Sequence, residues 1–291
     1  GEGFQMPEIP NYVVQWLIVL GVGLVCLAII FVILGTIARY VSETALIKLV
    51  DEYEETGVRH GVREGFRIGW SRTAFRLFLI GLLIVFPLVV FFILLAGSSV
   101  GVVLLSAVVL VGRAVVFGVI GIVAGIGMLF TTIMLIIVAS AVTSTLMHFF
   151  WRACALDDLG VVEAISEGFQ LVMRHLGDVV IMALIIFGLK IAWSVGVIAA
   201  SIILLPVILL VIVLAVILGG IPALIVGLVS SLFFPSAILP VIFAILVGLP
   251  IFILTVGAPW LFLNGLKETY ISTTWTLTYR ELRVLDEVVQ R

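Results

Sequence analysis

Two long regions without a single acidic residue constrain how this chain can fold. No Asp or Glu occurs in 65–156 or in 179–267, and most of each region is apolar. A bilayer crossing takes about 20 consecutive apolar residues. Five runs are long enough and predict membrane spans at 13–37, 74–96, 116–147, 178–204 and 237–265. The expected fold is an all-α, polytopic transmembrane helix bundle that forms one integral membrane domain.

The composition of the chain supports the same class. Of the 291 residues, 64% are hydrophobic and 11% are charged. Soluble globular domains are about 45–50% apolar and about 25% charged. The net charge is only −2, so the chain lacks the basic excess of a nucleic-acid-binding domain. A soluble enzyme, a disordered chain and a DNA-binding protein are excluded, and no nucleic-acid partner is expected.

The basic residues predict which parts of the chain face the cytoplasm. Thirteen of the fifteen Lys and Arg residues lie in three segments, 39–76, 152–174 and 267–291. The positive-inside rule puts all three on the cytoplasmic face, here of a bacterial plasma membrane. The prediction therefore has the N-terminus of the numbered chain outside, cytoplasmic connections called elbows at 39–73 and 151–176, and a cytoplasmic C-terminal tail at 267–291.

The segment 205–236 has both ends outside in this topology, although it is nearly all apolar. Prolines and a glycine pair punctuate it at Pro206, Gly219, Gly220, Pro222 and Pro235. Each half is about 14 residues long, which is short for a crossing. We expect an outer-side re-entrant or interfacial hairpin. Two short, distorted crossings are the alternative, and they leave the parity of the topology unchanged.

A short repeat links the two elbows. Glu64-Gly65-Phe66 and Glu167-Gly168-Phe169 lie 103 residues apart, each just before an apolar run. Acidic turns at 51–57 and 157–160 precede the two matching segments. The pattern predicts two related units, each a span, an amphipathic elbow and a second span. Duplicated halves are common in transporters, but scaffolds also contain them, so the repeat does not decide function.

The elbow helices carry opposite charges. Basic residues recur at helical spacing in the first elbow, at Arg59, Arg63 and Arg67. Glu163 and Glu167 do the same in the second. Two interpretations stay open. The arginines contact anionic lipid headgroups at the cytoplasmic face, or Arg63 or Arg67 pairs with one of the glutamates and joins the two units.

Lys190 stands 12 residues into the fourth predicted span. A charge near the bilayer centre costs about 2.5–3.5 kcal/mol on insertion scales. No Asp or Glu inside a span offers a counter-ion. Three alternatives follow: snorkelling to the interface, a site for an anionic lipid or ligand, and a contact with another subunit.

A glycine stripe marks the third predicted span at Gly118, Gly121 and Gly125. Gly121 and Gly125 form a small-xxx-small pair, which lets two helices approach closely. Packing within the chain is the expected use of this stripe, and homodimerisation is the alternative.

The chain has no recognisable catalytic motif. Its three histidines, His60, His148 and His175, are scattered and lie in no known metal or nucleophile signature. We predict no catalytic residues, no metal and no cofactor. An enzyme would have to use Asp157 and Asp158 together with His148 or His175.

The most recognisable sequence lies at 263–279, LNGLKETYISTTWTLTY, and at 155–169, ALDDLGVVEAISEGF. Both resemble a broad group of poorly characterised bacterial multi-pass proteins, which look like the membrane domain found fused to glycerophosphoryl diester phosphodiesterases. The resemblance covers most of the chain and implies a helical membrane domain. It also implies a further span and a Gly-rich outer loop before Gly1. The phosphodiesterase domain has no counterpart here, so that activity is not implied.

These observations predict a non-catalytic membrane scaffold or an accessory subunit of a membrane assembly. Its expected partners are membrane lipids with anionic headgroups, and other membrane subunits or copies of itself. The alternative is a lipid- or amphiphile-handling transporter with a cavity between the repeats that reaches Lys190. An enzyme ranks third, because its acidic residues are dispersed along the elbows.

Overall fold

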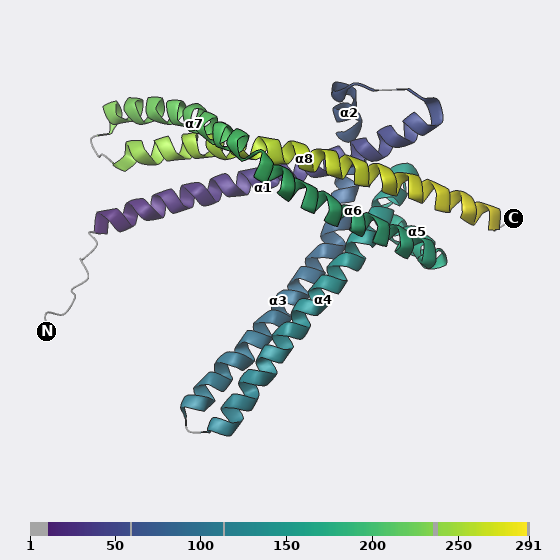
Figure 1. Ribbon diagram of the computed structural model, residues 1–291, viewed down its shortest axis with the longest axis horizontal. Coiled ribbons are helices and arrows are strands. Elements are labelled where there is room, and N and C mark those ends of the chain that lie inside the picture. The colour runs from purple at the N-terminus through teal and green to yellow at the C-terminus, as the bar shows by residue number, and fades with distance from the viewer. Residues whose placement is uncertain (1–10, 59, 113, 235–237, 290–291) are drawn as a thin grey trace. The chain divides into compact units, whose positions relative to one another are not determined.

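The computed structural model describes residues 11–58, 60–112, 114–234 and 238–289, and every element in these ranges is a helix. In chain order (Figure 1) the helices are α1 Asn11–Thr56, α2 Val62–Gly69, α3 Arg72–Val111, α4 Val115–Leu156, α5 Val161–Arg174, α6 Leu176–Ile203, α7 Leu205–Phe233 and α8 Ile238–Val289. Among the described residues, six helices are long and apolar enough to cross a membrane, all except α2 and α5. The chain is a multi-pass α-helical membrane protein.

The helices contribute to two compact units. The first unit contains Gly1–Ala38 and Ile186–Tyr270, and the second contains Arg39–Ile185 and Ile271–Arg291. Helices α1, α6 and α8 therefore each supply residues to both units, whereas α2 to α5 belong to the second and α7 belongs to the first.

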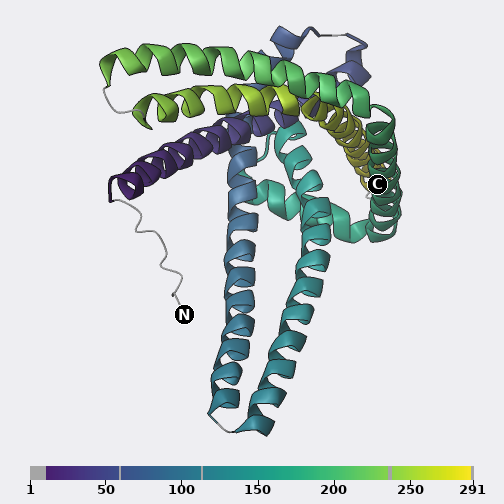
Figure 2. The ribbon, with the colours of Figure 1, turned by 60° about the vertical axis from the view of Figure 1, so that its left-hand side comes forward.

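In the first unit, α7 packs along the first part of α8 at backbone distance (Figure 2). A Cβ added to Gly219 would lie 2.8 Å from the carbonyl oxygen of Gly248, and one added to Gly248 would lie 2.7 Å from Ala223 Cβ. Farther along, a Cβ on Gly227 would be 3.4 Å from Ala244 Cβ. The two helices run antiparallel, and glycine at the crossing permits their close approach.

In the second unit, α3 and α4 form a long antiparallel hairpin (Figure 1). The predicted glycine stripe lies on the α4 side of this contact. A Cβ on Gly121 would lie 2.1 Å from Ser106 Oγ, and one on Gly125 would lie 2.5 Å from Val103 Cγ2. Gly118 faces the backbone of Leu110, with 2.7 Å from its Cβ position to the Leu110 Cα. The stripe therefore packs within the chain.

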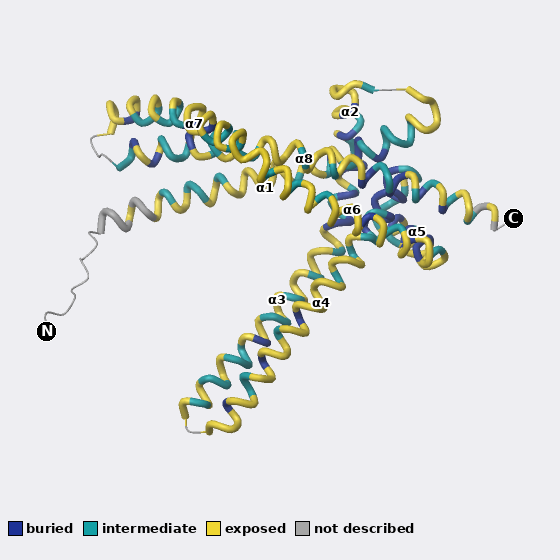
Figure 3. Tube along the Cα trace, viewed as in Figure 1, coloured by how far each residue is buried: buried dark blue, intermediate teal, exposed yellow. Residues whose placement is uncertain are grey.

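The buried side chains of the second unit gather away from the hairpin tip. Figure 3 shows mostly exposed residues along α3 and α4, with buried positions where the two helices face each other. Fully buried apolar side chains include Ile47 of α1, Leu77 of α3 and Phe149 of α4, together with Ile271 at 2% exposure in α8. The core of this unit thus lies where α1, α3, α4 and α8 meet.

Several helices extend beyond the predicted span ends. Helix α1 continues through the first half of the first elbow, and α8 continues through the predicted C-terminal tail. Backbone hydrogen bonds inside a helix are satisfied in lipid and in water alike, so leaving the membrane does not end a helix. Helix α1 ends at Thr56, just before Gly57, which adopts a φ of +69° that glycine tolerates best.

The structure differs from the expected outer hairpin at 205–236. Residues 205–233 form a single helix, α7, rather than two short halves, and positions 235 and 236 lie outside the described residues. Pro206 occupies the first turn of α7, where its missing N–H breaks no helical bond, and Pro222 is accommodated within the helix. An apolar segment gains most by closing its backbone bonds in one continuous helix.

Candidate functional site

A fully buried arginine organises the second unit. Arg152 lies near the end of α4, and its side chain has 0% exposure. A buried charge without partners carries a penalty of several kcal/mol, so its N–H groups need acceptors inside the protein. Helices α4 and α8 supply those acceptors, and α1 supplies an ion-pair partner, Glu43.

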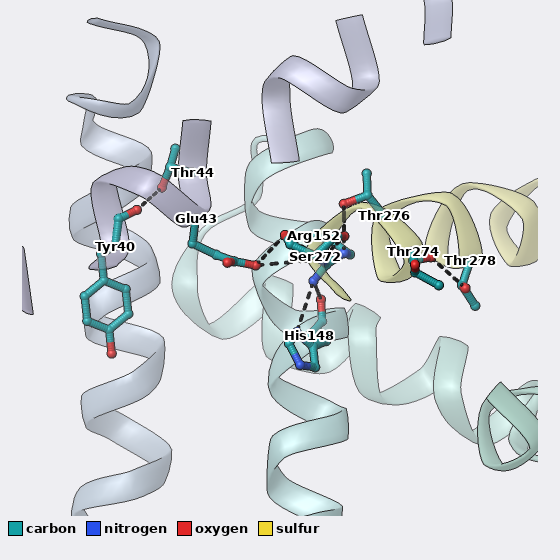
Figure 4. A network of polar contacts seen from close by, with 9 residues as sticks. All are labelled: Tyr40, Glu43, Thr44, His148, Arg152, Ser272, Thr274, Thr276 and Thr278. Atoms are coloured by element: carbon teal, nitrogen blue, oxygen red, sulfur yellow. Dashed lines mark hydrogen bonds and ion pairs between the residues drawn. The ribbon is translucent and has the colours of Figure 1, made fainter. Parts of the chain in front are cut away.

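Hydrogen bonds to three residues hold the guanidinium. Its Nε donates to Thr276 Oγ1 at 3.1 Å, and Nη1 donates to the His148 carbonyl at 2.7 Å. Nη2 donates to the Ser272 carbonyl at 2.7 Å and to Ser272 Oγ at 3.2 Å. The same hydroxyl donates to Glu43 Oε1 at 2.9 Å, and this oxygen lies 3.7 Å from Arg152 Nη2. These five residues are called the polar hub (Figure 4).

A polar stripe on α8 extends the contacts of the hub. Its members alternate by four and three residues, a spacing that keeps them on one helix face. They are Ser272, Thr276, Tyr279, Arg283 and Asp286. Beside the stripe, Arg280 pairs with Asp51 of α1. The C-terminal part of α8 is therefore joined to α1 by charge as well as through the hub.

The far end of the stripe reaches α4 and α5. The Tyr279 hydroxyl donates to Asp157 Oδ2 at 2.6 Å, and Arg283 forms an ion pair with the same carboxylate. Arg174 at the end of α5 donates to Asp286 Oδ2 at 2.7 Å. One face of α8 thus connects three other helices of the second unit.

Aromatic rings close off the polar hub. The ring of His148 stacks on Trp275, with centroids 5.4 Å apart, and Phe149 meets the same indole edge-on at 5.5 Å. Tyr40 packs edge-on against Trp151 at 5.9 Å. Phe149 and Trp275 are 1% and 2% exposed. Their packing excludes water, which strengthens each polar contact within and raises the cost of losing one.

Lys190, the predicted intramembrane charge, takes no part in the polar hub. Lys190 is exposed on α6, in the part of that helix that belongs to the first unit. It makes no hydrogen bond or ion pair with any residue that the structure describes. The protein itself therefore supplies this ammonium group with no counter-ion in the described ranges.

Arg67 and Glu163 of the two elbow helices have partners on the same helix or directly next to it. Arg59 lies outside the described residues. Arg67 Nη2 lies 3.7 Å from Glu64 Oε1 on the same helix. Glu163 Oε2 accepts a hydrogen bond from the backbone N–H of Gly160 at 3.2 Å, which caps α5.

No ion pair between α2 and α5 is present in the described part of the chain, so Arg63 and Glu167 do not join the elbows. A different ion pair connects the start of α3 with the turn before α5. Arg76 at the start of α3 lies 2.9 Å from Asp158 Oδ1 in the turn before α5. The link expected between elbow helices is thus made by the residues that flank them.

The acidic residues of the enzyme alternative take part in contacts between helices. Asp157 forms an ion pair with Arg283 of α8, and Asp158 forms one with Arg76 of α3. Among the described residues, no group of three or more His, Cys, Asp or Glu side chains could hold a metal ion.

The sequence contained a signal for the polar hub that the analysis of spans overlooked. The polar residues of 272–286 repeat with a heptad spacing, which marks one helix face that contacts other helices. Nothing in the spacing identifies Arg152 or Glu43 as the partners, because they lie more than a hundred residues away.

Comparisons with known proteins give no relative. No family model, no curated protein and no solved structure matches this chain. The resemblance to phosphodiesterase-fused membrane domains therefore stays a prediction.

The polar hub makes a first prediction about stability. Replacing Arg152 by Met removes the cation that pairs with Glu43 and the N–H groups that donate to the Ser272 carbonyl, and we expect a loss of about 3–5 kcal/mol in unfolding free energy. Thermal and denaturant unfolding in detergent micelles would measure it. Arg174→Met is the control, because its pair with Asp286 is half exposed and worth about 1 kcal/mol or less. Equal losses in the two variants would contradict the assigned role.

A second prediction concerns pH. His60, between α1 and α2, has Nε2 3.1 Å from Glu52 Oε1 and Nδ1 3.1 Å from Glu64 Oε2. The contact with Glu64 raises the pKa of His60 above its ordinary value of 6.5, and the charge of Glu52 acts the same way. A raised pKa in the folded state stabilises the fold below the ordinary pKa, and this stabilisation is lost as pH rises through the raised value.

We therefore expect α2 to be held more firmly at about pH 5.5 than at about pH 8.5. Hydrogen exchange of 60–69, corrected for intrinsic rates, would measure this in the full chain. His60→Gln should remove the difference between the two pH values. A variant that keeps the whole difference would show that other groups cause it.

Proposed function

We propose that this chain is a non-catalytic scaffold or accessory subunit of a membrane assembly, located in a bacterial plasma membrane. The polar hub would fix the cytoplasmic ends of the helices. The spans would then offer their apolar faces to partner helices from other subunits or from copies of the same chain.

The exposed spans carry this proposal. Of the most apolar 18-residue stretch of α3, α4 and α7, only 17%, 11% and 11% is buried. Lipid or helices of other membrane subunits would cover this apolar surface.

An unused small-residue pair on α3 supports protein partners over lipid alone. Gly97 and Gly101 are spaced four apart, and a Cβ added to either would meet nothing within 4 Å. The glycine stripe of α4 is occupied within the chain, whereas this pair is open. A small-xxx-small pair lets a second helix approach closely enough for van der Waals contact along the backbone.

The proposed topology has the N-terminus of the numbered chain outside and the C-terminus in the cytoplasm, with two related span–elbow–span units. The distribution of basic residues supports it, because the segments 39–76, 152–174 and 267–291 contain thirteen of the fifteen Lys and Arg residues. In this topology two of the three candidate spans α6, α7 and α8 would cross the membrane.

The partner proposal predicts an effect of Gly97 and Gly101. Native mass spectrometry after gentle detergent extraction should find a stoichiometric partner or a defined oligomer. The double substitution Gly97→Leu and Gly101→Leu should reduce the complex about tenfold, equivalent to about 1.4 kcal/mol. Gly127→Leu is the matched control, since this α4 glycine also meets nothing within 4 Å. A monomer that retains one lipid class would instead favour the transporter alternative.

The topology predicts where Leu204, between α6 and α7, is accessible. If α6 crosses the membrane, a Leu204→Cys variant on a Cys26→Ser background reacts with an impermeant maleimide from outside. If α6 lies along the cytoplasmic surface, labelling requires permeabilised cells. Val58→Cys in the exposed α1–α2 turn is the cytoplasmic control. Labelling of both positions from outside in intact cells would overturn the proposed orientation.

A further inference from the structure

Helix α2 packs against the protein through its glycines. A Cβ on Gly69 would lie 2.3 Å from the Val41 carbonyl oxygen, and one on Gly65 would lie 3.0 Å from Leu49 Cδ1. Both glycines are buried. The side of α2 that faces α1 therefore has no room for side chains, and every large side chain of this helix must point elsewhere.

The apolar side chains of α2 point outward. Val62, Phe66 and Trp70 are 95%, 61% and 62% exposed. The rings of Phe66 and Trp70 stack on each other, with centroids 5.8 Å apart. An amphipathic helix on a soluble domain would bury this ridge against its core. Here the ridge has no cover in the described structure, so its natural environment lies outside the protein.

A basic ridge runs beside the apolar one. Arg63 is exposed, and the Arg67 side chain is 81% exposed. The acid nearest to Arg67 is Glu64, at 3.7 Å, and that carboxylate is closer to His60, at 3.1 Å. The protein therefore neutralises these two guanidinium groups only weakly, and both are accessible to an anion outside the protein.

We propose that α2 lies in the membrane interface and binds anionic lipid headgroups. Phe66 and Trp70 would sit at the acyl boundary, where aromatic rings are favoured. Arg63 and Arg67 would reach the phosphates just above them. Only Trp70 and Ser71 separate α2 from α3, whose apolar run begins at Ala74, so the chain enters the membrane at this point.

Helix α5 is an internal comparison. It has the same construction, because its Gly168 faces Phe150 Cδ1 at 2.7 Å from the Cβ position, and its Phe169 and Met173 are 48% and 53% exposed. Where α2 has arginines, α5 has Glu163 and Glu167. Both helices would lie at the interface, and only α2 would select anionic lipid. This lipid contact does not depend on any protein partner.

Hydrogen exchange of the full chain in lipid nanodiscs tests the proposal. One disc contains phosphatidylcholine alone, and the other contains about one third phosphatidylglycerol. Two surface arginines correspond to at most about 30-fold in lipid association, so exchange of 62–70 should slow several-fold, up to about 30-fold, in the anionic disc. The difference should shrink at high salt, because salt screens exposed charges.

Matched variants separate the lipid contact from folding. Arg63→Gln with Arg67→Gln should abolish the lipid difference in α2, and Glu163→Gln with Glu167→Gln should leave it unchanged. Phe66→Ser with Trp70→Ser should speed exchange of α2 in both discs. Hydrogen exchange of the α3–α4 hairpin reports whether each variant is folded. The salt dependence of exchange in the wild-type protein is a further test that needs no variant.

Equal exchange of α2 in both discs for the wild type would overturn the proposal. So would a lipid difference that survives in the arginine variant. Neither result bears on the scaffold proposal, which native mass spectrometry tests through protein partners.

Discussion

A buried guanidinium with no nearby counter-ion in sequence is the constraint on which the second unit depends. Arg152 is fully buried, its hydrogen-bond acceptors come from α8 and from its own helix, and its ion-pair partner Glu43 comes from α1. A charge in that position is tolerated only when its partners are in place. The parts of α1, α4 and α8 that carry these residues must therefore meet in the folded protein.

Polar contacts and close helix packing stabilise different parts of the protein. Within lipid, burying apolar surface between helices gains little, because lipid tails are as apolar as leucine. Specific association there relies on close packing, as between Gly219 and Gly248 or along the glycine stripe of α4. At the hub, hydrogen bonds and ion pairs can specify partners directly. This difference explains why the apolar spans are largely exposed, whereas the residues around the polar hub are densely connected.

The two elbow helices, α2 and α5, pack in the same way but differ in the charge of their exposed residues. In each, a glycine of the repeated Glu-Gly-Phe segment faces the preceding long helix, while the phenylalanine beside it is exposed. A Cβ on Gly65 would lie 3.0 Å from the Leu49 side chain, and a Cβ on Gly168 would lie 2.7 Å from the Phe150 ring and 3.2 Å from the Phe150 backbone nitrogen. The outward residues are free to differ, and they differ in charge. One helix therefore presents a basic surface and the other an acidic one, although both pack in the same way.

The sequence alone determined the membrane class and predicted the two short helices that the structure has at 62–69 and 161–174, because hydropathy and periodicity are local properties of the chain. It predicted five crossings, and the structure contains six helices capable of crossing, since 205–233 closes into one helix despite its glycines and Pro222. Periodicity also identified which residues share a helix face. It could not say what covers that face.

Only the tertiary structure decided that Arg152 meets Glu43 and Ser272, because these residues are far apart in the sequence and their contact depends on three helices converging. It likewise decided that the aromatic ridge of α2 points away from the protein, since that orientation follows from the glycines packing against α1.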